Sequence, residues 1–111
     1  MPSRIEMLRL FMQQRPADPF PHYALAMEYK NSGDLATAWT TFESLMLAHA
    51  GYTPAYLHAG NTLVTLGRVP EAKMIYARGV EVATKAGDAH ARGELEGALA
   101  SVSSGPVSSE S

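Results

Sequence analysis

Apolar and polar residues along this chain of 111 residues follow the three- and four-residue spacing of helices. Alanine, leucine and methionine are frequent, and the alternating pattern of strands is rare. Proline and glycine interrupt the pattern at nearly regular points, so about six helices are expected. The predicted fold class is therefore all-α. The expected helices span about 3–15, 19–31, 35–49, 54–66, 69–85 and 88–103.

The same start and stop signals occur twice within this pattern. Asp18 before Pro19 is a good helix start, because the carboxylate caps the first turn and proline suits the first helical position. Thr53 before Pro54 repeats that signal. Glycine then follows each helix, at Gly33 and at residue 67, where it can adopt the left-handed conformation that ends a helix.

Aligning the chain with itself so that Gly33 meets Gly67 brings its small and apolar positions into register. The clearest further matches place Ala38 and Phe42 opposite Ala72 and Tyr76. Identity is lost between these pairs, as in a structural repeat, where packing positions recur and solvent positions drift. The small residues would let paired helices approach closely, and the aromatic residues would fill the volume between pairs.

These residues resemble the tetratricopeptide repeat (TPR), a helix–turn–helix unit of about 34 residues. The first repeat supplies the family's packing positions as His22, Leu25, Ala26, Tyr29, Gly33, Ala38 and Phe42. The second supplies them as Tyr56, Ala59, Gly60, Leu63, Gly67, Ala72 and Tyr76. The sequence departs from the pattern at His22, where a large aromatic residue is usual, and at Gly79, which is expected to weaken the fifth helix.

The resemblance implies antiparallel helix pairs stacked as a short right-handed superhelix, as in small stand-alone bacterial TPR proteins. Two repeats are fewer than such folds usually need, so the flanking helices are expected to act as caps. The implied organisation is an N-terminal capping helix at 1–16, repeats at 19–52 and 53–86, and a C-terminal capping helix at 88–103. The polar, serine-rich segment 104–111 is expected to be disordered.

In TPR proteins the first helix of each pair lines a concave groove that binds peptides or helices of other proteins. The resemblance therefore implies a set of partner-binding residues on the second, fourth and closing helices. These are Phe20, Tyr23, Met27, Lys30, Leu57, Asn61, Val64 and His90. The set is more apolar than a solvated helix face, which favours an apolar or amphipathic ligand. The Asn61 amide suits a peptide backbone; the alternative for Phe20 and Tyr23 is packing on the first helix.

Some TPR proteins bind a C-terminal carboxylate with a clamp of lysine and asparagine residues. Here Tyr23 and Met27 occupy the places of the first lysine and asparagine, and His58 stands where the second asparagine would be. The chaperone-tail binding that this clamp supports is therefore not expected.

Composition narrows the choice of partner. The chain has no cysteine, which excludes disulfides and thiolate chemistry and fits a cytoplasmic protein. Its formal net charge is −2 and its nine Lys and Arg residues are scattered, so a nucleic-acid partner is not expected. No apolar run is long enough to span a membrane.

No pattern of catalytic or metal-binding residues is evident. The histidines, His22, His49, His58 and His90, are not expected to pair at i+4 with another histidine or a well-placed carboxylate. Nucleotide-binding loops and nucleophile elbows are also missing from the sequence. We therefore expect no enzyme activity, no metal and no cofactor.

Two functions remain open from the sequence. The first is a binding module that recruits one segment of a partner protein through the groove. The second is self-association through the groove or the terminal helices, because the first helix is apolar on more than one side. Its apolar residues are Ile5, Met7, Leu8, Leu10, Phe11 and Met12.

Overall fold

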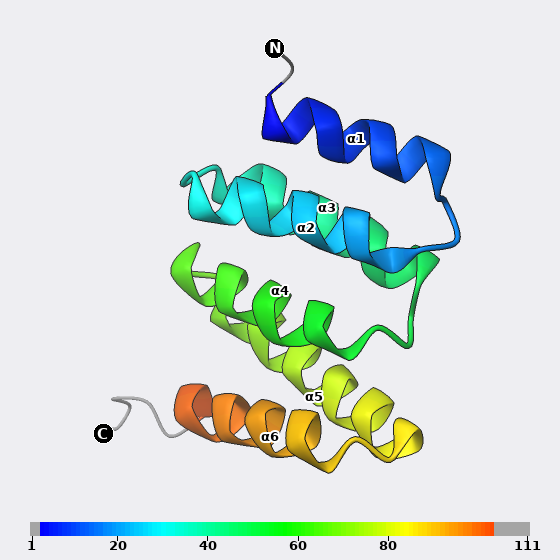
Figure 1. Cartoon of the computed structure of the whole chain (residues 1–111). Coiled ribbons are helices and arrows are strands. Elements are labelled where there is room, and N and C mark those ends of the chain that lie inside the picture. The colour runs from blue at the N-terminus through cyan, green and yellow to red at the C-terminus, as the bar shows by residue number, and fades with distance from the viewer. Residues whose placement is uncertain (1–2, 104–111) are drawn as a thin grey trace.

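The computed structural model describes residues 3–103. Six helices follow one another within this range, which confirms the all-α prediction (Figure 1). They are α1 (Arg4–Gln14), α2 (Pro19–Asn31), α3 (Leu35–Ala48), α4 (Thr53–Thr65), α5 (Val69–Ala86) and α6 (Ala89–Ser103). The segment expected to be disordered, 104–111, lies outside the described residues.

Side chains cap most of the helices at their first turn. Ser3 and Glu6 form a reciprocal capping box at the start of α1. The Asp18 carboxylate accepts a hydrogen bond of 3.0 Å from the backbone of Phe20, as the sequence predicted for α2. The start of α4 differs: Thr53 is already helical, and Tyr52 precedes it without a side-chain cap. Pro54 near the start of α4 needs no N–H partner, which makes this helix less dependent on a cap.

Consecutive helices run antiparallel and stack in two layers. α2, α4 and α6 form one layer, and α3 and α5 lie behind it (Figure 1). Gly33 and Gly67, at the two tight turns, have φ angles of 89° and 80°. These are left-handed conformations that glycine adopts without strain, so the matched glycines are the hinges of the two helix pairs.

Close helix approach is achieved at small residues, as the repeat predicted. Ala26, Ala38, Ala59 and Ala72 are fully buried. A Cβ at Gly60 would overlap the ring of Tyr76. The ring of Tyr76 in α5 therefore packs directly against the backbone of α4 at Gly60.

Gly79 has a packing role that the sequence analysis did not predict. A Cβ at this position would lie 2.7 Å from the Cβ of Tyr56 and 2.9 Å from Cδ2 of Leu95. Glycine is the residue that lets α5 contact α4 and α6 at once. Gly79 therefore has a packing role in addition to its expected weakening of the helix, which stays a prediction.

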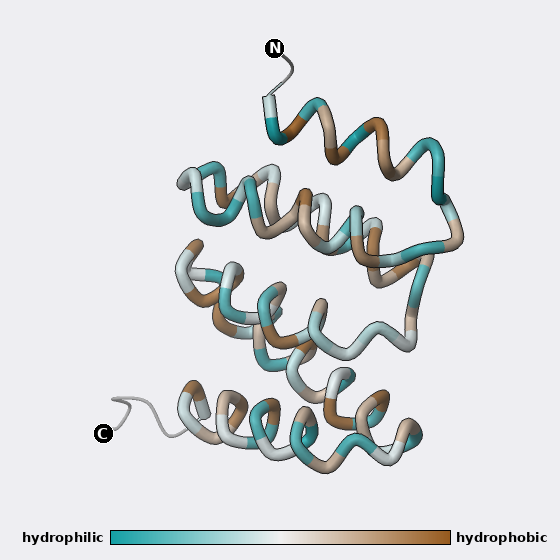
Figure 2. The backbone as a smooth tube through the Cα atoms, viewed as in Figure 1, coloured by the Kyte–Doolittle hydropathy of each residue, from teal (hydrophilic) through white to brown (hydrophobic). Residues whose placement is uncertain are grey.

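Apolar positions occur along every helix, including α1 at the edge of the stack (Figure 2). The aromatic residues Phe42 and Tyr76 are both buried. Among the described residues, α1 contacts α2 alone and buries only Leu8. Polar contacts also hold α1 in place, since Arg9 donates to the Tyr29 hydroxyl and Arg4 pairs with Glu28 at 2.8 Å. The N-terminal edge of the stack is thus more open than its interior.

Candidate binding groove

The layer formed by α2, α4 and α6 carries all of the predicted partner-binding residues. α4 contacts α2 on one side and α6 on the other, so side chains from the three helices share one face. We call this face the groove and define it by Tyr23, Met27, Leu57, His58 and Asn61.

Tyr23 is the centre of a group of aromatic rings at one end of the groove. Its ring centroid lies 5.4 Å from that of Tyr52 in an edge-on arrangement and 5.8 Å from that of His58. Phe20 lies 6.4 Å away on the side facing α1. Such contacts fix the relative orientation of the rings. Tyr52 was not predicted, because it belongs to the loop before α4.

Phe20 occupies a different position from the other predicted residues. Its side chain is 59% exposed and borders a hollow between α1 and α2, together with Phe11. It therefore connects the aromatic end of the groove to the edge of the stack. Packing of Phe20 on the first helix, the alternative to partner binding, accounts for only part of its surroundings, because most of the residue is exposed.

Met27, Leu57 and Val64 lie at the margin of the hydrophobic core. Each is half-buried and packs against the core, and part of each residue is accessible to solvent. Lys30 is also half-buried, and within residues 3–103 it forms no ion pair. The groove thus combines an apolar floor with a lysine whose charge no described carboxylate neutralises.

Asn61 is tied to the helix behind it. Its Oδ1 accepts a hydrogen bond from the hydroxyl of Tyr76, the aromatic spacer of the second repeat. The amide nitrogen forms no hydrogen bond with any described residue. The side chain is therefore oriented by Tyr76, and its donor end is not engaged by any described residue.

His58 lies in the middle of the groove, and its Nδ1 is buried without a hydrogen-bond partner among the described residues. Burial lowers the pKa of His58, the charge of Lys30 lowers it further, and Glu94 opposes both effects. The ring is consequently neutral near pH 7, where it adds no charge to the apolar floor. The sequence indicated His58 only as a departure from the clamp.

A hollow of about 300 Å³ separates α4 from α6. Leu57 and His58 line it on one side, and Glu94 and His90 on the other. His90 is exposed at the rim, with Nε2 3.5 Å from Glu94. The prediction that no histidine pairs with a carboxylate at i+4 is therefore wrong for His90. This spacing was visible in the sequence, because residues four apart lie on the same helix face.

Within residues 3–103, no group of three or more histidine, cysteine, aspartate or glutamate side chains is arranged so that it could hold a metal ion. His22 is the other histidine whose pKa is lowered, by burial and then by His49. His22 and His49 line a separate hollow near the start of α2, which His58 and His90 do not line.

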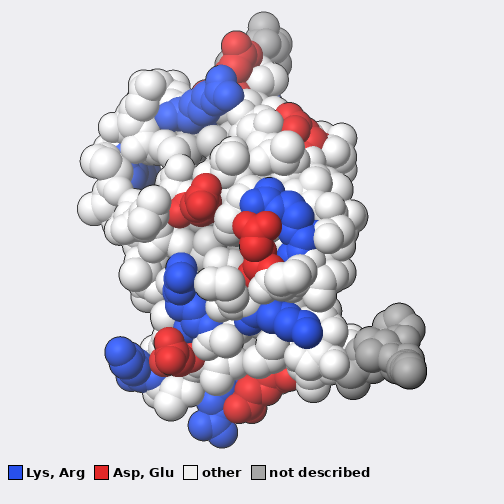
Figure 3. All heavy atoms as spheres, turned by 180° about the vertical axis from the view of Figure 1, so that it is seen from behind, with Lys and Arg blue, Asp and Glu red and all other residues white. Residues whose placement is uncertain are grey.

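The opposite face also has a hollow, which the sequence analysis did not identify. It has a volume of about 300 Å³ and lies between α3 and α5. Trp39 and Ile75 form part of its wall, and Leu47 and Met74 project from its edge with 84% and 64% of their side chains exposed. Acidic and basic side chains intermingle on this face (Figure 3). Within the described range it has neither the aromatic group nor the unpaired amide donor of the groove.

None of the helices in the described range is both long and apolar enough to cross a membrane.

Solved structures of similar shape include a tetratricopeptide repeat domain protein from Salinibacter ruber. Its crystal structure is 34% identical, with a TM-score of 0.73, and the match covers 78% of this chain and 96% of that one. A solution structure from the same organism, also of a tetratricopeptide repeat domain protein, is 32% identical with a TM-score of 0.78, covering 86% and 96%. A Bordetella parapertussis protein shares the fold at 20% identity and a TM-score of 0.78, covering 93% and 90%.

No family model and no curated protein matches the chain. The match to the Salinibacter ruber protein nevertheless combines 34% identity with nearly the full length of that domain. It agrees with the internal repeat, the paired helices and the glycine hinges described above. The chain belongs to the tetratricopeptide repeat family.

Proposed function

We propose that this protein is a binding module that holds a peptide or helix of a partner protein in the groove, without catalysis. The observation that carries the proposal is the aromatic group around Tyr23, next to an amide donor that Tyr76 orients. Partly exposed aromatic rings bury large apolar area at small cost in conformational entropy. The amide nitrogen of Asn61 would then fix the direction of the bound backbone.

The ligand that this groove suits is apolar or amphipathic. Leu57 and Met27 offer apolar contact, and His58 is neutral near pH 7. Lys30 at the margin favours a ligand with an acidic residue there. A cytoplasmic location belongs to the same proposal and is supported by the absence of cysteine.

Peptides selected by phage display on the immobilised protein would test this proposal. Binding of a selected peptide should be lost when Tyr23→Ala and Met27→Ala are combined. The matched control combines Leu47→Ala and Met74→Ala, two exposed apolar residues of the opposite face. Circular dichroism should be unchanged in both variants. Binding that survives the groove variant, or is lost only in the control, would show that the ligand binds elsewhere.

Self-association is the second candidate function. The observation that favours it is the exposure of Met7, Leu10 and Phe11 on α1, with 40–49% of each side chain accessible. Three large apolar side chains on one short helix form a surface that water solvates poorly. This surface lies at the edge of the stack, so that self-association and groove binding are compatible.

A further inference from the structure

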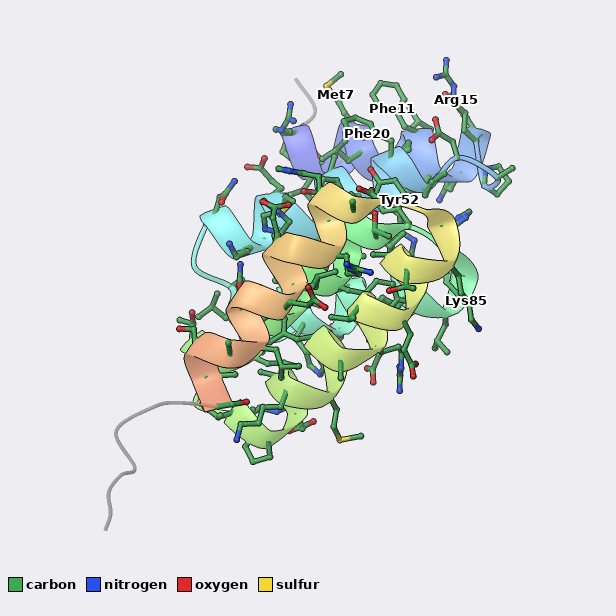
Figure 4. The ribbon with its side chains drawn as sticks, turned by 90° about the horizontal axis from the view of Figure 1, so that it is seen from below. Met7, Phe11, Arg15, Phe20, Tyr52 and Lys85 are labelled. Carbon is green, nitrogen blue, oxygen red and sulfur yellow. The ribbon has the colours of Figure 1, made fainter. Side chains whose placement is uncertain are left out.

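The α1 edge contains a hollow that the repeat itself explains. Its volume is about 350 Å³, and its walls come from α1 and α2. We call it the edge groove and define it by Leu8, Phe11, Phe20, Pro21 and Ala24. Figure 4 shows Met7, Phe11 and Phe20 gathered at this edge.

The edge groove corresponds to the surfaces on which α2 and α4 lie. One repeat length of 34 residues further along the chain, the positions equivalent to Leu8 and Phe11 are Phe42 and Leu45 of α3. Both of these residues are fully buried. The positions equivalent to Asp18 and Ala24 are likewise Tyr52 and His58, whose rings contact Tyr23 of α2. In the interior of the stack a helix covers these positions, whereas at the edge no described residue does so.

We propose that a second copy of this chain fills the edge groove, with α1 of each copy lying in the edge groove of the other. This inference rests on the self-association candidate and gives it a geometry. In each pair the first helix runs antiparallel to the second (Figure 1), so the edge groove accepts a helix antiparallel to α1. A two-fold axis across α1 places the α1 of a second copy in that direction.

α1 also has the length and chemistry that its own groove requires. It has 11 residues, against 13 in both α2 and α4. Met7, Leu10 and Phe11 have the i, i+3, i+4 spacing of an apolar helix face. Each copy therefore supplies both a groove and a helix that fits it.

Charge supports the antiparallel arrangement. Glu6 lies in the first turn of α1, and Arg15 caps its last turn. When two copies of α1 overlap antiparallel, Glu6 of each copy comes close to Arg15 of the other, which is favourable. A parallel arrangement would bring like charges together. Arg4 stands where the repeats have Ala38 and Ala72, so the closest approach is expected near Phe11.

Sedimentation equilibrium of the full chain over a range of concentrations would test the inference. Wild type should reach twice the monomer mass of 11.9 kDa. Phe11→Glu should raise the dissociation constant of the dimer at least about 30-fold, because it places a charge in the edge groove. Leu47→Glu, at an exposed site on the opposite face, should leave that constant unchanged.

Charge reversal tests the orientation. Glu6→Arg and Arg15→Glu should each weaken the dimer, and the double variant should restore it, with circular dichroism controlling for the lost capping box. A dimer that the double variant does not restore overturns the antiparallel arrangement but not self-association. A monomer at every concentration overturns both and leaves groove binding, which the peptide experiment measures, unaffected. A dimer lost in Leu47→Glu and not in Phe11→Glu would overturn the edge groove as its interface.

Discussion

At the C-terminal end of the stack α6 contacts both α4 and α5, whereas at the N-terminal end α1 contacts only α2 among the described residues. Leu95 of α6 is 1% exposed and Leu8 of α1 is 7% exposed. The larger contrast lies on the outer sides of the two helices. No large apolar side chain of α6 is strongly exposed within the described residues, but three of α1 are. Because α6 packs against two helices, it leaves no large apolar side chain strongly exposed within the described residues. Because α1 packs against one helix, it leaves an apolar surface exposed.

The largest effect is expected from Leu95→Ala at the closed end. This side chain is fully buried between α6 and the helices beneath it, so truncation should reduce the free energy of unfolding by about 3 kcal/mol. Leu8→Ala at the open end should cost about 2 kcal/mol, because fewer neighbours surround the cavity. Urea denaturation of both variants measures the difference. Equal losses would mean that both ends are closed equally well.

Two glycines near the closed end sharpen the comparison. Gly79→Ala should destabilise the protein by about 1–2 kcal/mol, because the new methyl group would overlap Tyr56 and Leu95. Gly97→Ala is the matched control in α6, where an added Cβ would have no neighbour within 4 Å apart from the adjoining residues and the backbone of its own helix. It should stabilise the protein by about 0.5–1 kcal/mol through helix propensity.

Thermal denaturation followed by the helical circular dichroism signal suffices for both glycine variants. Opposite signs would show that the close contact of α5 with α6, and not helix propensity, determines the residue at position 79. Stabilisation by both substitutions would contradict the packing role of Gly79.

The fold could be predicted from the sequence because its signals are local and repeated. Gly33 and Gly67 at the tight turns, Ala38 and Ala72, and the aromatic residues Phe42 and Tyr76 stand at equivalent positions of the two repeats. The start of α2 could also be predicted from the sequence, because it depends on the side chain of Asp18, two residues before the backbone N–H that it caps. The role of Gly79 was not, because it depends on Tyr56 and Leu95, which reach it only through the tertiary fold.

The candidate site was less predictable than the fold. The resemblance to the repeat family implied a groove position for Tyr23 and Asn61, but it said nothing of their partners Tyr52 and Tyr76, which come from other elements. The buried Nδ1 of His58 depends on how three helices surround it. The division of the chain into repeats at 19–52 and 53–86, and the ligand-binding role of the groove residues, stay predictions.

His58 lies between the two ends and allows their electrostatic effects to be compared. Its pKa in the folded protein is lowered, so between that value and about 6.5 the unfolded chain binds more protons. The free energy of unfolding should therefore decrease as pH falls below about 6.5, and this contribution should be absent above it. In His58→Asn the decrease should be smaller, and the difference should be modest because the group is only half-buried.

NMR titration of His58 separates the contributions of the neighbouring helices. Lys30→Met in α2 should raise the pKa of His58, and Glu94→Gln in α6 should lower it by a smaller amount. Tyr23, the ionisable ring that contacts His58, is neutral over this range, because the ordinary pKa of tyrosine is about 10 and burial raises the pKa of Tyr23 further. A larger shift in Glu94→Gln would mean that α6 dominates the field at this site.

The smallest effect is expected from Leu10→Lys at the open end, and it depends on concentration. Leu10 is 49% exposed, and the equivalent positions of the two repeats, Ser44 and Arg78, are polar and exposed. In dilute solution the free energy of unfolding should therefore change by no more than about 0.5 kcal/mol.

At high concentration a dimer would stabilise the wild type by mass action, and its melting temperature should rise with concentration. The lysine variant should show no such rise, because each copy would place a charge in the contact. Differential scanning calorimetry over a range of concentrations measures both regimes. A melting temperature of the wild type that is independent of concentration would mean that the apolar surface of α1 stays exposed in solution.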